Sequence, residues 1–410
     1  MKFVVVTYGT EGDTRPLAAL CRALIEAGHQ ALLLADDATL GAARSLGVPT
    51  VPLAGDIRGA LRAGASMSGA VAGGEGFSNL TRALARIANA NAESWLRAVV
   101  EAGRGCDAVI LSGLAAFIGL SAAEHLGVRA IGTGLIPISP TTEFPSPFLP
   151  PRLVPRFLNR ASHRFVDAML WRAFRAATNA ARARVCGLPP RRRLWTEHPM
   201  LYGISPSLLP PPADWPPTTR LCGQWTLPVP HWSPPAPLAG FLAAGEKPLY
   251  VGFGSMTGFD RVRLLEAVIA GVGGRRALFH AGWSGLDPAA LPPNFLAIGD
   301  TPHGWLFPRT SLVIHHGGSG TTHSAARAGV PSVVVPFAGD QPFWADRLAR
   351  LGVAAPPLRG TAPSGEALAH AIAFAERAET RDRARALGAR MAPEDGLGTA
   401  VAAIARLMAG

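Results

Sequence analysis

The sequence predicts an α/β protein with two Rossmann-like β/α/β domains, each with a parallel sheet covered by helices, facing each other across a deep cleft. Three observations lead to this prediction. Short apolar runs of strand length alternate with longer segments of helical spacing, glycine-rich turns follow several of these runs, and a proline-rich segment at residues 205–237 interrupts the alternation. A length of 410 residues also favours two domains over one.

The first half opens with the apolar run Lys2–Thr7, whose lack of polar alternation predicts a central strand buried on both faces. We expect a loop over residues 8–15 and then a helix with Pro16 in its first turn, ending at Gly28. Residues 77–103 predict one long helix. Further strands are expected at residues 31–36, 49–54, 107–112 and 129–135.

The second half follows residues 205–237, where the density of prolines predicts a connection without regular elements. The strand–helix pattern then restarts, with a helix at 260–272. The expected strands are at residues 247–255, 276–282, 294–300, 311–317 and 331–337. We therefore expect a first domain at 1–212, a second domain at 213–392, and a C-terminal helix at 393–410 that packs back on the first domain.

The net charge of +11 comes almost entirely from arginine, because Lys2 and Lys247 are the only lysines. Nucleic-acid binding is disfavoured, since the arginines are scattered and lack interleaved stacking aromatics.

The four cysteines have no metal-type spacing and are interpreted as structural thiols of a reducing compartment. The apolar run at the start of the sequence is too short for the hydrophobic region of a signal peptide. No apolar run is long enough to span a bilayer, so we expect a cytoplasmic protein.

The segment Ser311–Gly329 combines a buried strand, a glycine-rich turn and a helix start. His315 lies at the carboxyl end of the strand, Gly317 and Gly320 lie in the turn, and Thr321 lies near the helix N-terminus. Unpaired N–H groups and the partial positive charge of a helix N-terminus are suited to a diphosphate. The alternative is a tight strand–helix turn with a satisfied histidine.

Two other strand ends carry candidate ligands. Gly254 and Ser255 follow the strand at 247–255 and could offer an N–H and a hydroxyl to the same phosphates, although such a pair is also ordinary in turns. Asp340 and Gln341 supply acceptors and donors together, which suits vicinal hydroxyls of a sugar. Asp340 could instead, or in addition, be the N-cap of the next helix.

At this point the residues show a family resemblance. The segment Gly299–Leu348 resembles the donor-binding signature of the family 1 glycosyltransferases, which have the two-domain GT-B fold. The stretches 251–256, 302–308 and 141–148 resemble the sterol 3-β-glucosyltransferase branch, whose outline the glycopeptide glycosyltransferases share. The resemblance is dense in the C-terminal half and is limited in the N-terminal half to the first loop and 141–148.

The resemblance implies a role for each matching position. His315 would contact the diphosphate, Trp305 would hold the nucleobase, and Asp340 with Gln341 would bind the sugar hydroxyls. The further donor-binding residues that it implies are Gly12, Gly254, Ser255, Gly317, Gly320 and Thr321. The donor would be a UDP- or TDP-sugar, with a hexose and specifically glucose as the expected sugar, and no cofactor or metal is expected.

Asp13, in the loop after the first strand, is the expected general base for the acceptor hydroxyl. Its alternative role is a helix N-terminal acid that stabilises the helix dipole. Many relatives use a histidine with a supporting aspartate at this site, whereas this loop has no histidine. Relatives often carry arginine where this chain has Glu11, so we expect Glu11 to turn away from the diphosphate or to touch the sugar or acceptor. The expected reaction is a single displacement with inversion.

The acceptor is expected to be a hydrophobic polycyclic or lipid-like alcohol, bound by loops at 62–77 and 136–165. The named candidates are Thr142, Phe144 and Phe148. The mixture of phenylalanine and arginine at 136–165 could form a peripheral membrane contact, or simply a solvated basic face. A nucleotide-sugar 2-epimerase and a non-catalytic nucleotide-sugar binder remain as alternatives, and either a monomer or a dimer is compatible with the sequence.

Overall fold

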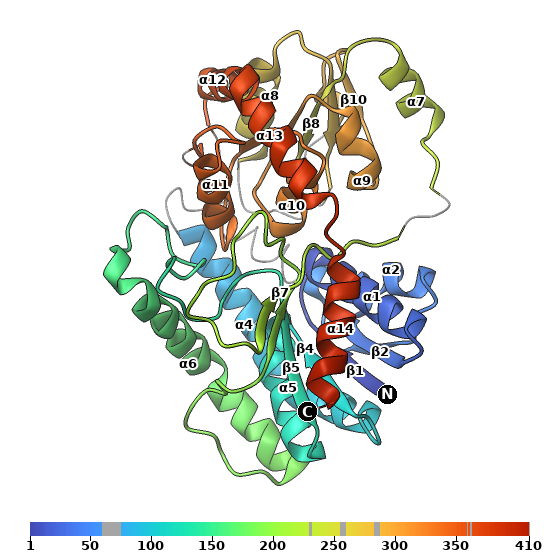
Figure 1. Ribbon diagram of the computed structural model, residues 1–410, viewed down its shortest axis with the longest axis vertical. Coiled ribbons are helices and arrows are strands. Elements are labelled where there is room, and N and C mark those ends of the chain that lie inside the picture. Colours follow the sequence, from blue (N-terminus) through green and yellow to red (C-terminus); the bar gives the residue numbers. More distant parts are fainter. Residues whose placement is uncertain are drawn as a thin grey trace.

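The computed structural model describes residues 1–59, 75–228, 232–254, 260–282, 288–358, 360 and 363–409, with the backbone alone for 75–82. These residues form two α/β units stacked along the long axis of the molecule, and both termini lie in the lower unit (Figure 1). Each unit contains one parallel β-sheet with helices on both faces. The predicted fold class is confirmed.

The N-terminal sheet has the strand order β3-β2-β1-β4-β5-β6-β7, and every pair is parallel. The central strand β1 is buried on both faces, since Phe3 and Val5 pack on one side while Val4 and Val6 pack on the other. The strands are β1 (Lys2–Val6), β2 (Gln30–Asp36), β3 (Thr50–Leu53), β4 (Ala108–Leu111), β5 (Arg129–Gly134), β6 (Met200–Tyr202) and β7 (Thr219–Leu221).

Helices cover both faces of this sheet. One face carries the first helix, α1, together with α2 and the C-terminal helix α14, and the other carries α4, α5 and α6. These helices are α1 (Glu11–Glu26), α2 (Gly41–Ser45), α4 (Glu75–Ala102), α5 (Ala116–Leu126), α6 (Asn159–Cys186) and α14 (Gly396–Ala409).

The C-terminal sheet has the strand order β10-β9-β8-β11-β12, again parallel throughout. Its strands are β8 (Leu249–Gly252), β9 (Ala277–His280), β10 (Phe295–Ala297), β11 (Leu312–His315) and β12 (Ser332–Val334). Its helices are α7 (Ala236–Ala243), α8 (Arg261–Val272), α9 (His303–Leu306), α10 (Ser319–Arg327), α11 (Gln341–Arg350), α12 (Gly365–Ala375) and α13 (Ala378–Met391).

Two expectations about local structure need correction. The proline-rich segment does contain a regular element, because β7 pairs with β6, so the N-terminal sheet extends beyond residue 212. An edge strand tolerates neighbouring prolines because one of its sides needs no ladder hydrogen bonds. Helix α1 begins at Glu11, ahead of Pro16, because Thr10 caps it; residues 11–15 are helical and not a loop.

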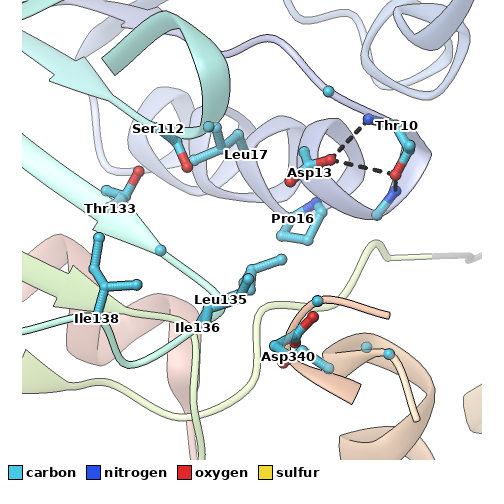
Figure 2. Close-up of a pocket in the computed structure, with 18 of the residues that line it drawn as sticks. Thr10, Asp13, Pro16, Leu17, Ser112, Thr133, Leu135, Ile136, Ile138 and Asp340 are labelled. Atoms are coloured by element: carbon cyan, nitrogen blue, oxygen red, sulfur yellow. Dashed lines mark hydrogen bonds between the residues drawn. The ribbon is translucent and has the colours of Figure 1, made fainter. Parts of the chain in front are cut away.

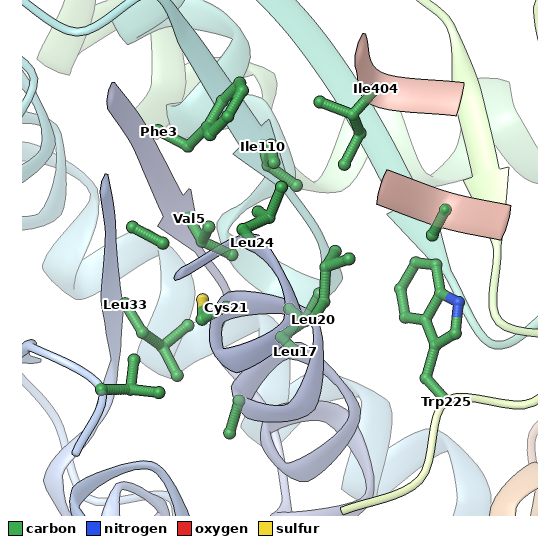
Figure 3. Close-up of a cluster of buried hydrophobic side chains, with 14 of the residues drawn as sticks. Phe3, Val5, Leu17, Leu20, Cys21, Leu24, Leu33, Ile110, Trp225 and Ile404 are labelled. Carbon is green, nitrogen blue, oxygen red and sulfur yellow. The ribbon is translucent and has the colours of Figure 1, made fainter. Parts of the chain in front are cut away.

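Residues 204–225 and the later crossing of the chain between the two units at 392–396 are joined by hydrogen bonds. Ser205 Oγ donates to Glu394 Oε1 at 2.8 Å, and Trp225 Nε1 donates to the Gly396 carbonyl at 3.1 Å. After the second crossing, α14 packs against α1, with Ile404 and Trp225 closing a cluster that includes Leu20 (Figure 3). The C-terminal helix therefore lies on the N-terminal unit.

None of the helices in the described part of the chain is both long and apolar enough to cross a membrane. The cysteines are unbridged thiols, and Cys21, Cys106 and Cys222 are buried.

Replacing Ile404 with alanine tests the packing of α14. The side chain is fully buried in the cluster with α1, so we expect Ile404→Ala to lower the free energy of unfolding by about 2–5 kcal/mol in urea denaturation. The exposed Thr399 on the same helix provides the control, and Thr399→Ala should stay within about 0.5 kcal/mol of wild type. Equal effects of the two changes would contradict this packing.

Candidate active site

A cavity of about 2070 Å³ lies between the two units and opens at the carboxyl ends of both sheets. In the first sheet the strand order reverses between β1 and β4, and in the second it reverses between β8 and β11. Loops diverge at such switch points and leave a crevice, which is where ligands bind in open parallel sheets. Both crevices contribute to this one cavity.

Asp13 reaches the cavity from the first turn of α1, and its carboxylate also stabilises the helix start (Figure 2). Asp13 Oδ2 accepts hydrogen bonds from the Thr10 backbone N–H at 2.7 Å and from the Thr10 hydroxyl at 3.2 Å. Thr10 Oγ1 in turn accepts from the Gly12 N–H at 3.3 Å. This is a capping box with aspartate at the third helical position, so the cap role and a position at the cavity coexist.

The residue before Thr10 leaves room for that carboxylate. A Cβ at Gly9 would lie 2.2 Å from Asp13 Oδ2, so only glycine allows this close approach. Burial raises the pKa of Asp13, and the hydrogen bonds from Thr10 oppose that rise. A half-buried carboxylate with a raised pKa is a better proton acceptor than an exposed one.

Asp340 lies on the facing wall, after β12, across the cavity from Asp13 and Pro16 (Figure 2). It occupies the N-cap position of α11, but its side chain makes no cap hydrogen bond. Instead Asp340 Oδ2 accepts from Trp344 Nε1 at 2.7 Å, and the Trp344 ring contacts the edge of His323. Burial raises the pKa of Asp340 to about 6, and the negative charge of Asp13 adds to the rise.

Gln341 also lines the cavity, and its side-chain carbonyl holds the loop that precedes it. Oε1 accepts from the N–H groups of Phe337 at 2.7 Å and Ala338 at 3.1 Å. Gln341, the first residue of α11, thereby fixes the loop that carries Asp340.

The two histidines after β11 have different environments. His315 is fully buried and does not line the cavity; its Nδ1 accepts from the Gly317 N–H at 3.1 Å and so shapes the turn. His316 is half-buried and lines the cavity. His315, expected at the diphosphate, therefore lies behind the cavity wall, since successive residues at a strand end point to opposite sides and His316 is the one that lines the cavity.

His316 packs tightly within the glycine-rich turn. A Cβ at Gly318 would lie 2.4 Å from His316 Nε2, and a Cβ at Gly254 would lie 3.0 Å from Cε1 of the same ring. Burial lowers the pKa of His316 to about 4, so the ring is neutral near neutral pH and one nitrogen carries a donor N–H. The absence of side chains at Gly254 and Gly318 lets this ring stand at the cavity wall.

The N-terminus of α10 opens into the same part of the cavity. Gly318 is its N-cap without a side-chain cap, and Gly320 and Thr321 of its first turn line the cavity, as does Gly254 after β8. Gly317 is buried beneath the turn and does not line the cavity. Ser255 lies outside the described residues.

Trp305 does not line the cavity, contrary to the expectation for this residue. Its ring packs against Trp232, with ring centroids 4.7 Å apart, and beneath the guanidinium of Arg309 at 4.2 Å. The neighbouring His303 and Gly304, and Trp232 itself, line the cavity instead. The side chain at position 305 is turned away because α9 is a single short turn that buries Leu306.

Glu11 takes part in a chain of charges at the cavity rim. Arg15 Nε lies 2.9 Å from Glu11 Oε2, and Arg15 Nη2 lies 3.3 Å from Asp300 Oδ2 of the C-terminal unit. Asp300 also contacts His280 at 3.1 Å, and this hydrogen bond, followed by the charge of Arg15, lowers the pKa of Asp300 to about 2. The rim therefore presents the Arg15 guanidinium beside the Glu11 carboxylate.

The three expected acceptor residues are placed differently. Phe148 lines the cavity, whereas Thr142 and Phe144 do not. Both carboxylate oxygens of Asp214 are engaged by Thr141 and Thr142, and the Phe144 ring packs 5.3 Å from that of Phe343 across the two units. The side chains of Thr142 and Phe144 therefore hold this segment in place and do not face the cavity.

The N-terminal wall of the cavity is mostly apolar. Ser112 and Thr133 lie at the ends of β4 and β5, and one carboxylate, Asp167, interrupts the wall on α6 (Figure 2 shows the strand-end residues). Burial raises the pKa of Asp167 to about 6. The apolar side chains include Leu84, Leu114, Phe117, Leu135, Ile136, Ile138, Phe165, Met169, Leu170 and Phe174. The residues expected at 62–77 lie outside the described residues, except that 75–77 begin α4.

Sequence reasoning missed His316, Trp232 and Asp167. For His316 the sequence carried part of the signal, because two adjacent residues at a strand end point to opposite sides and so differ in environment. Trp232 is hidden in the proline-rich segment, where no periodicity assigns a direction. Asp167 lies in a regular helix, and nothing in its local sequence separates a cavity-facing acid from a solvated one.

The raised pKa of Asp340 predicts a pH-dependent stability. An acid whose pKa is higher in the folded than in the unfolded chain makes folding less favourable once it ionises, so the wild type loses stability relative to Asp340→Asn as the pH rises through about 6. The asparagine can still accept from Trp344 Nε1. Urea denaturation of both proteins from about pH 4.5 to about pH 7.5 measures this difference. A difference that stays constant with pH would contradict the assigned environment.

Comparison with known proteins agrees with this geometry. Residues 280–402 match the family described as the C-terminal domain of erythromycin biosynthesis protein CIII-like proteins. The chain is 34% identical to the O-mycaminosyltylonolide 6-deoxyallosyltransferase of Streptomyces fradiae, over 97% of this chain and 95% of that protein. It is 31% identical to the sterol 3-beta-glucosyltransferase UGT80B1 of Arabidopsis thaliana, over 99% of this chain and 68% of that protein.

The chain spans a smaller share of some relatives: it is 32% identical to the sterol 3-beta-glucosyltransferase of Neurospora crassa but covers 27% of its length. Among solved structures, the glycosyltransferase VinC in complex with DTDP aligns with a TM-score of 0.66 at 18% identity, covering 100% of this chain and 99% of that one. Two parallel sheets meeting at one cavity, with these relatives, place the chain in the family 1 glycosyltransferases of GT-B fold.

Proposed function

We propose that this glycosyltransferase moves a hexose, with glucose as the expected sugar, from a nucleoside diphosphate to a hydroxyl of a hydrophobic acceptor, with inversion at the anomeric carbon. The observation that supports this most strongly is the composition of one cavity. A carboxylate at the start of α1 and an uncapped helix N-terminus at the start of α10 open into it from facing units.

The C-terminal wall suits the donor. The first-turn N–H groups of α10 and the His316 ring can hold a diphosphate, because helix N-termini attract anions and a neutral imidazole donates one hydrogen bond. Asp340 and Gln341 line the same cavity and would bind the sugar hydroxyls, while His303 and Gly304, which also line it, would contact the pyrimidine base. UDP and TDP both fit this description, and one structural neighbour has DTDP bound.

The N-terminal wall suits an apolar acceptor. Its leucines, isoleucines and phenylalanines favour a polycyclic or lipid-like molecule over a sugar or a peptide. Asp167 would accept a hydrogen bond from a polar group of that molecule. Relatives of this chain are named for sterol and tylonolide-type acceptors, and a sterol or a polyketide-type alcohol is the acceptor class that we propose.

In the proposed reaction Asp13 takes the proton of the acceptor hydroxyl. The hydroxyl oxygen forms a bond to the anomeric carbon as the bond from that carbon to the phosphate oxygen breaks, and the nucleoside diphosphate leaves with the electron pair. The α10 N-terminus, His316 and Arg15 stabilise the charge that develops on the leaving group. Thr10 keeps the Asp13 carboxylate oriented throughout.

A nucleotide-sugar 2-epimerase or a non-catalytic binder needs no acceptor wall. The apolar N-terminal half of the cavity therefore favours the transferase over both alternatives. A transfer assay with UDP-glucose and TDP-glucose against a panel of sterols and macrolide aglycones tests the proposal, and we expect the activity to survive EDTA. Consumption of donor with no glycosylated product, or a loss of activity in EDTA, would count against it.

Two substitutions separate the base from the helix cap. Asp13→Asn retains an oxygen that can accept from Thr10 but cannot take a proton, so we expect kcat to fall roughly 10²–10⁴-fold with the melting temperature little changed. Asp13→Ala also removes the cap and should lower the free energy of unfolding by about 1 kcal/mol as well. Undiminished transfer by Asp13→Asn would exclude this residue as the base.

The pH dependence of kcat/KM gives a second test of Asp13 as the base. A base must be ionised, and because burial raises the pKa of Asp13, kcat/KM should fall on the acidic side at a pH above the ordinary range of an aspartate. The acidic limb should disappear from the residual activity of Asp13→Asn. An unchanged limb in that variant would assign it to another group.

The two adjacent histidines provide a matched pair. His316→Ala should weaken binding of UDP or TDP by roughly tenfold or more in isothermal titration calorimetry, since one hydrogen bond to a charged group is lost. His315→Ala should instead lower the melting temperature, because the Gly317 N–H loses its buried acceptor. Weaker nucleotide binding in a fully stable His315→Ala protein, with normal binding in His316→Ala, would reverse the assignment.

A further inference from the structure

An exposed apolar surface lies at the start of α6, next to the acceptor side of the cavity. Eight large hydrophobic residues are exposed in the described part of the chain, and five of them lie between residues 153 and 169. These five, which we call the 153–169 surface, are Leu153, Phe157, Leu158, Phe165 and Met169. Phe157 is 85% and Leu153 is 77% exposed, which is unusual for side chains of this size.

The surface combines the first turns of α6 with the segment that leads into it. Phe157 and Leu158 belong to the 3-10 turn Arg156–Leu158 that leads directly into α6, and Phe165 and Met169 follow at helical spacing. The opposite side of α6 is buried, for example through Phe174 and Trp171. The exposed apolar side chains therefore protrude from an element that the rest of the unit holds in place.

The segment that carries this surface is rich in positive charge. From Arg152 to Arg175 the chain carries six arginines, all exposed, and one acidic residue, Asp167, which faces the cavity. Arg156, Arg160 and Arg164 take part in none of the ion pairs formed by the described residues. The arginines are Arg152, Arg156, Arg160, Arg164, Arg172 and Arg175.

The surface is continuous with the cavity. Phe165 and Met169 are more than half exposed and also line the cavity, together with Arg160 and Arg164. Exposed apolar side chains interspersed with exposed arginines match the layered structure of an anionic bilayer, whose headgroups attract arginine and whose acyl region accepts apolar side chains. An apolar route thus leads from this surface to the acceptor wall.

We propose that the 153–169 surface docks the enzyme on an anionic lipid bilayer and that the hydrophobic acceptor passes from the bilayer along Phe165 and Met169 into the cavity. The docking stands on the exposed side chains and their charge alone. The passage of the acceptor rests on the proposed function. A soluble acceptor needs no docking, so transfer to it is independent of this surface.

Vesicle co-sedimentation of the full chain tests the docking. We expect binding to vesicles of phosphatidylcholine with phosphatidylserine, little binding to phosphatidylcholine alone, and weaker binding at high salt. The double variant Leu153→Ser/Phe157→Ser, whose two side chains do not line the cavity, should bind at least roughly tenfold more weakly. Arg156→Gln should weaken binding by about fivefold, because one basic contact with the headgroups is lost.

Matched controls lie on the C-terminal unit. Val262 on α8 is 68% exposed, and Arg381 on α13 is exposed, so Val262→Ser and Arg381→Gln remove the same kinds of group away from the proposed surface. Both should bind vesicles as wild type does. A wild type that ignores anionic vesicles, or binding reduced equally by the control and the surface variants, would overturn the docking.

The activity of the variants separates this proposal from the proposed function. Leu153→Ser/Phe157→Ser should keep full transfer to a soluble acceptor and lose transfer to an acceptor embedded in vesicles. If the enzyme binds vesicles but transfers no sugar to any acceptor, the docking is supported, whereas the proposed function and the passage of the acceptor into the cavity are refuted. In the opposite outcome, the protein fails to bind vesicles and self-associates in a way that the double variant abolishes. That result would show that the 153–169 surface binds a second copy of this chain, and it would overturn the docking.

Discussion

The hydrogen bonds between Thr10 and Asp13 are the contact on which the proposed chemistry depends. They end the loop after β1, start α1, and hold the carboxylate at the cavity wall with its pKa raised by burial. Gly9 permits this arrangement because any side chain there would overlap Asp13. Stability of the helix start and orientation of the base are therefore properties of the same contact, and a variant must be chosen with care to change one without the other.

The C-terminal unit follows a related principle, in which buried residues position the exposed ones. His315 holds the turn through the Gly317 N–H, while its neighbour His316 faces the cavity. Trp344 likewise fixes Asp340, and Gln341 closes the loop that presents it. The side chains that can touch a donor are thus held by packing before any ligand arrives, which reduces the ordering that binding requires.

The two walls of the cavity differ in polarity, and this difference favours transfer between unlike partners. The C-terminal wall presents N–H groups, a neutral imidazole and carboxylates, whereas the N-terminal wall is largely apolar up to the 153–169 surface at the start of α6. Arg15 and Asp300 connect the walls at the rim. Because both side chains are substantially exposed, this ion pair contributes little stability.

Local sequence was sufficient to predict the two parallel sheets, the glycine-rich turn and Asp13, because strand length, helical spacing and turn chemistry depend on near neighbours. It was not sufficient for His316, Trp232, β7 or Asp167. Which of two adjacent histidines is buried depends on the helices above β11, and whether an acid on α6 meets solvent or a cavity depends on the facing unit. The packing of the C-terminal helix on the N-terminal unit was an expectation from the sequence, but its partner α1 was visible only in the folded chain, where contacts join residues far apart in sequence.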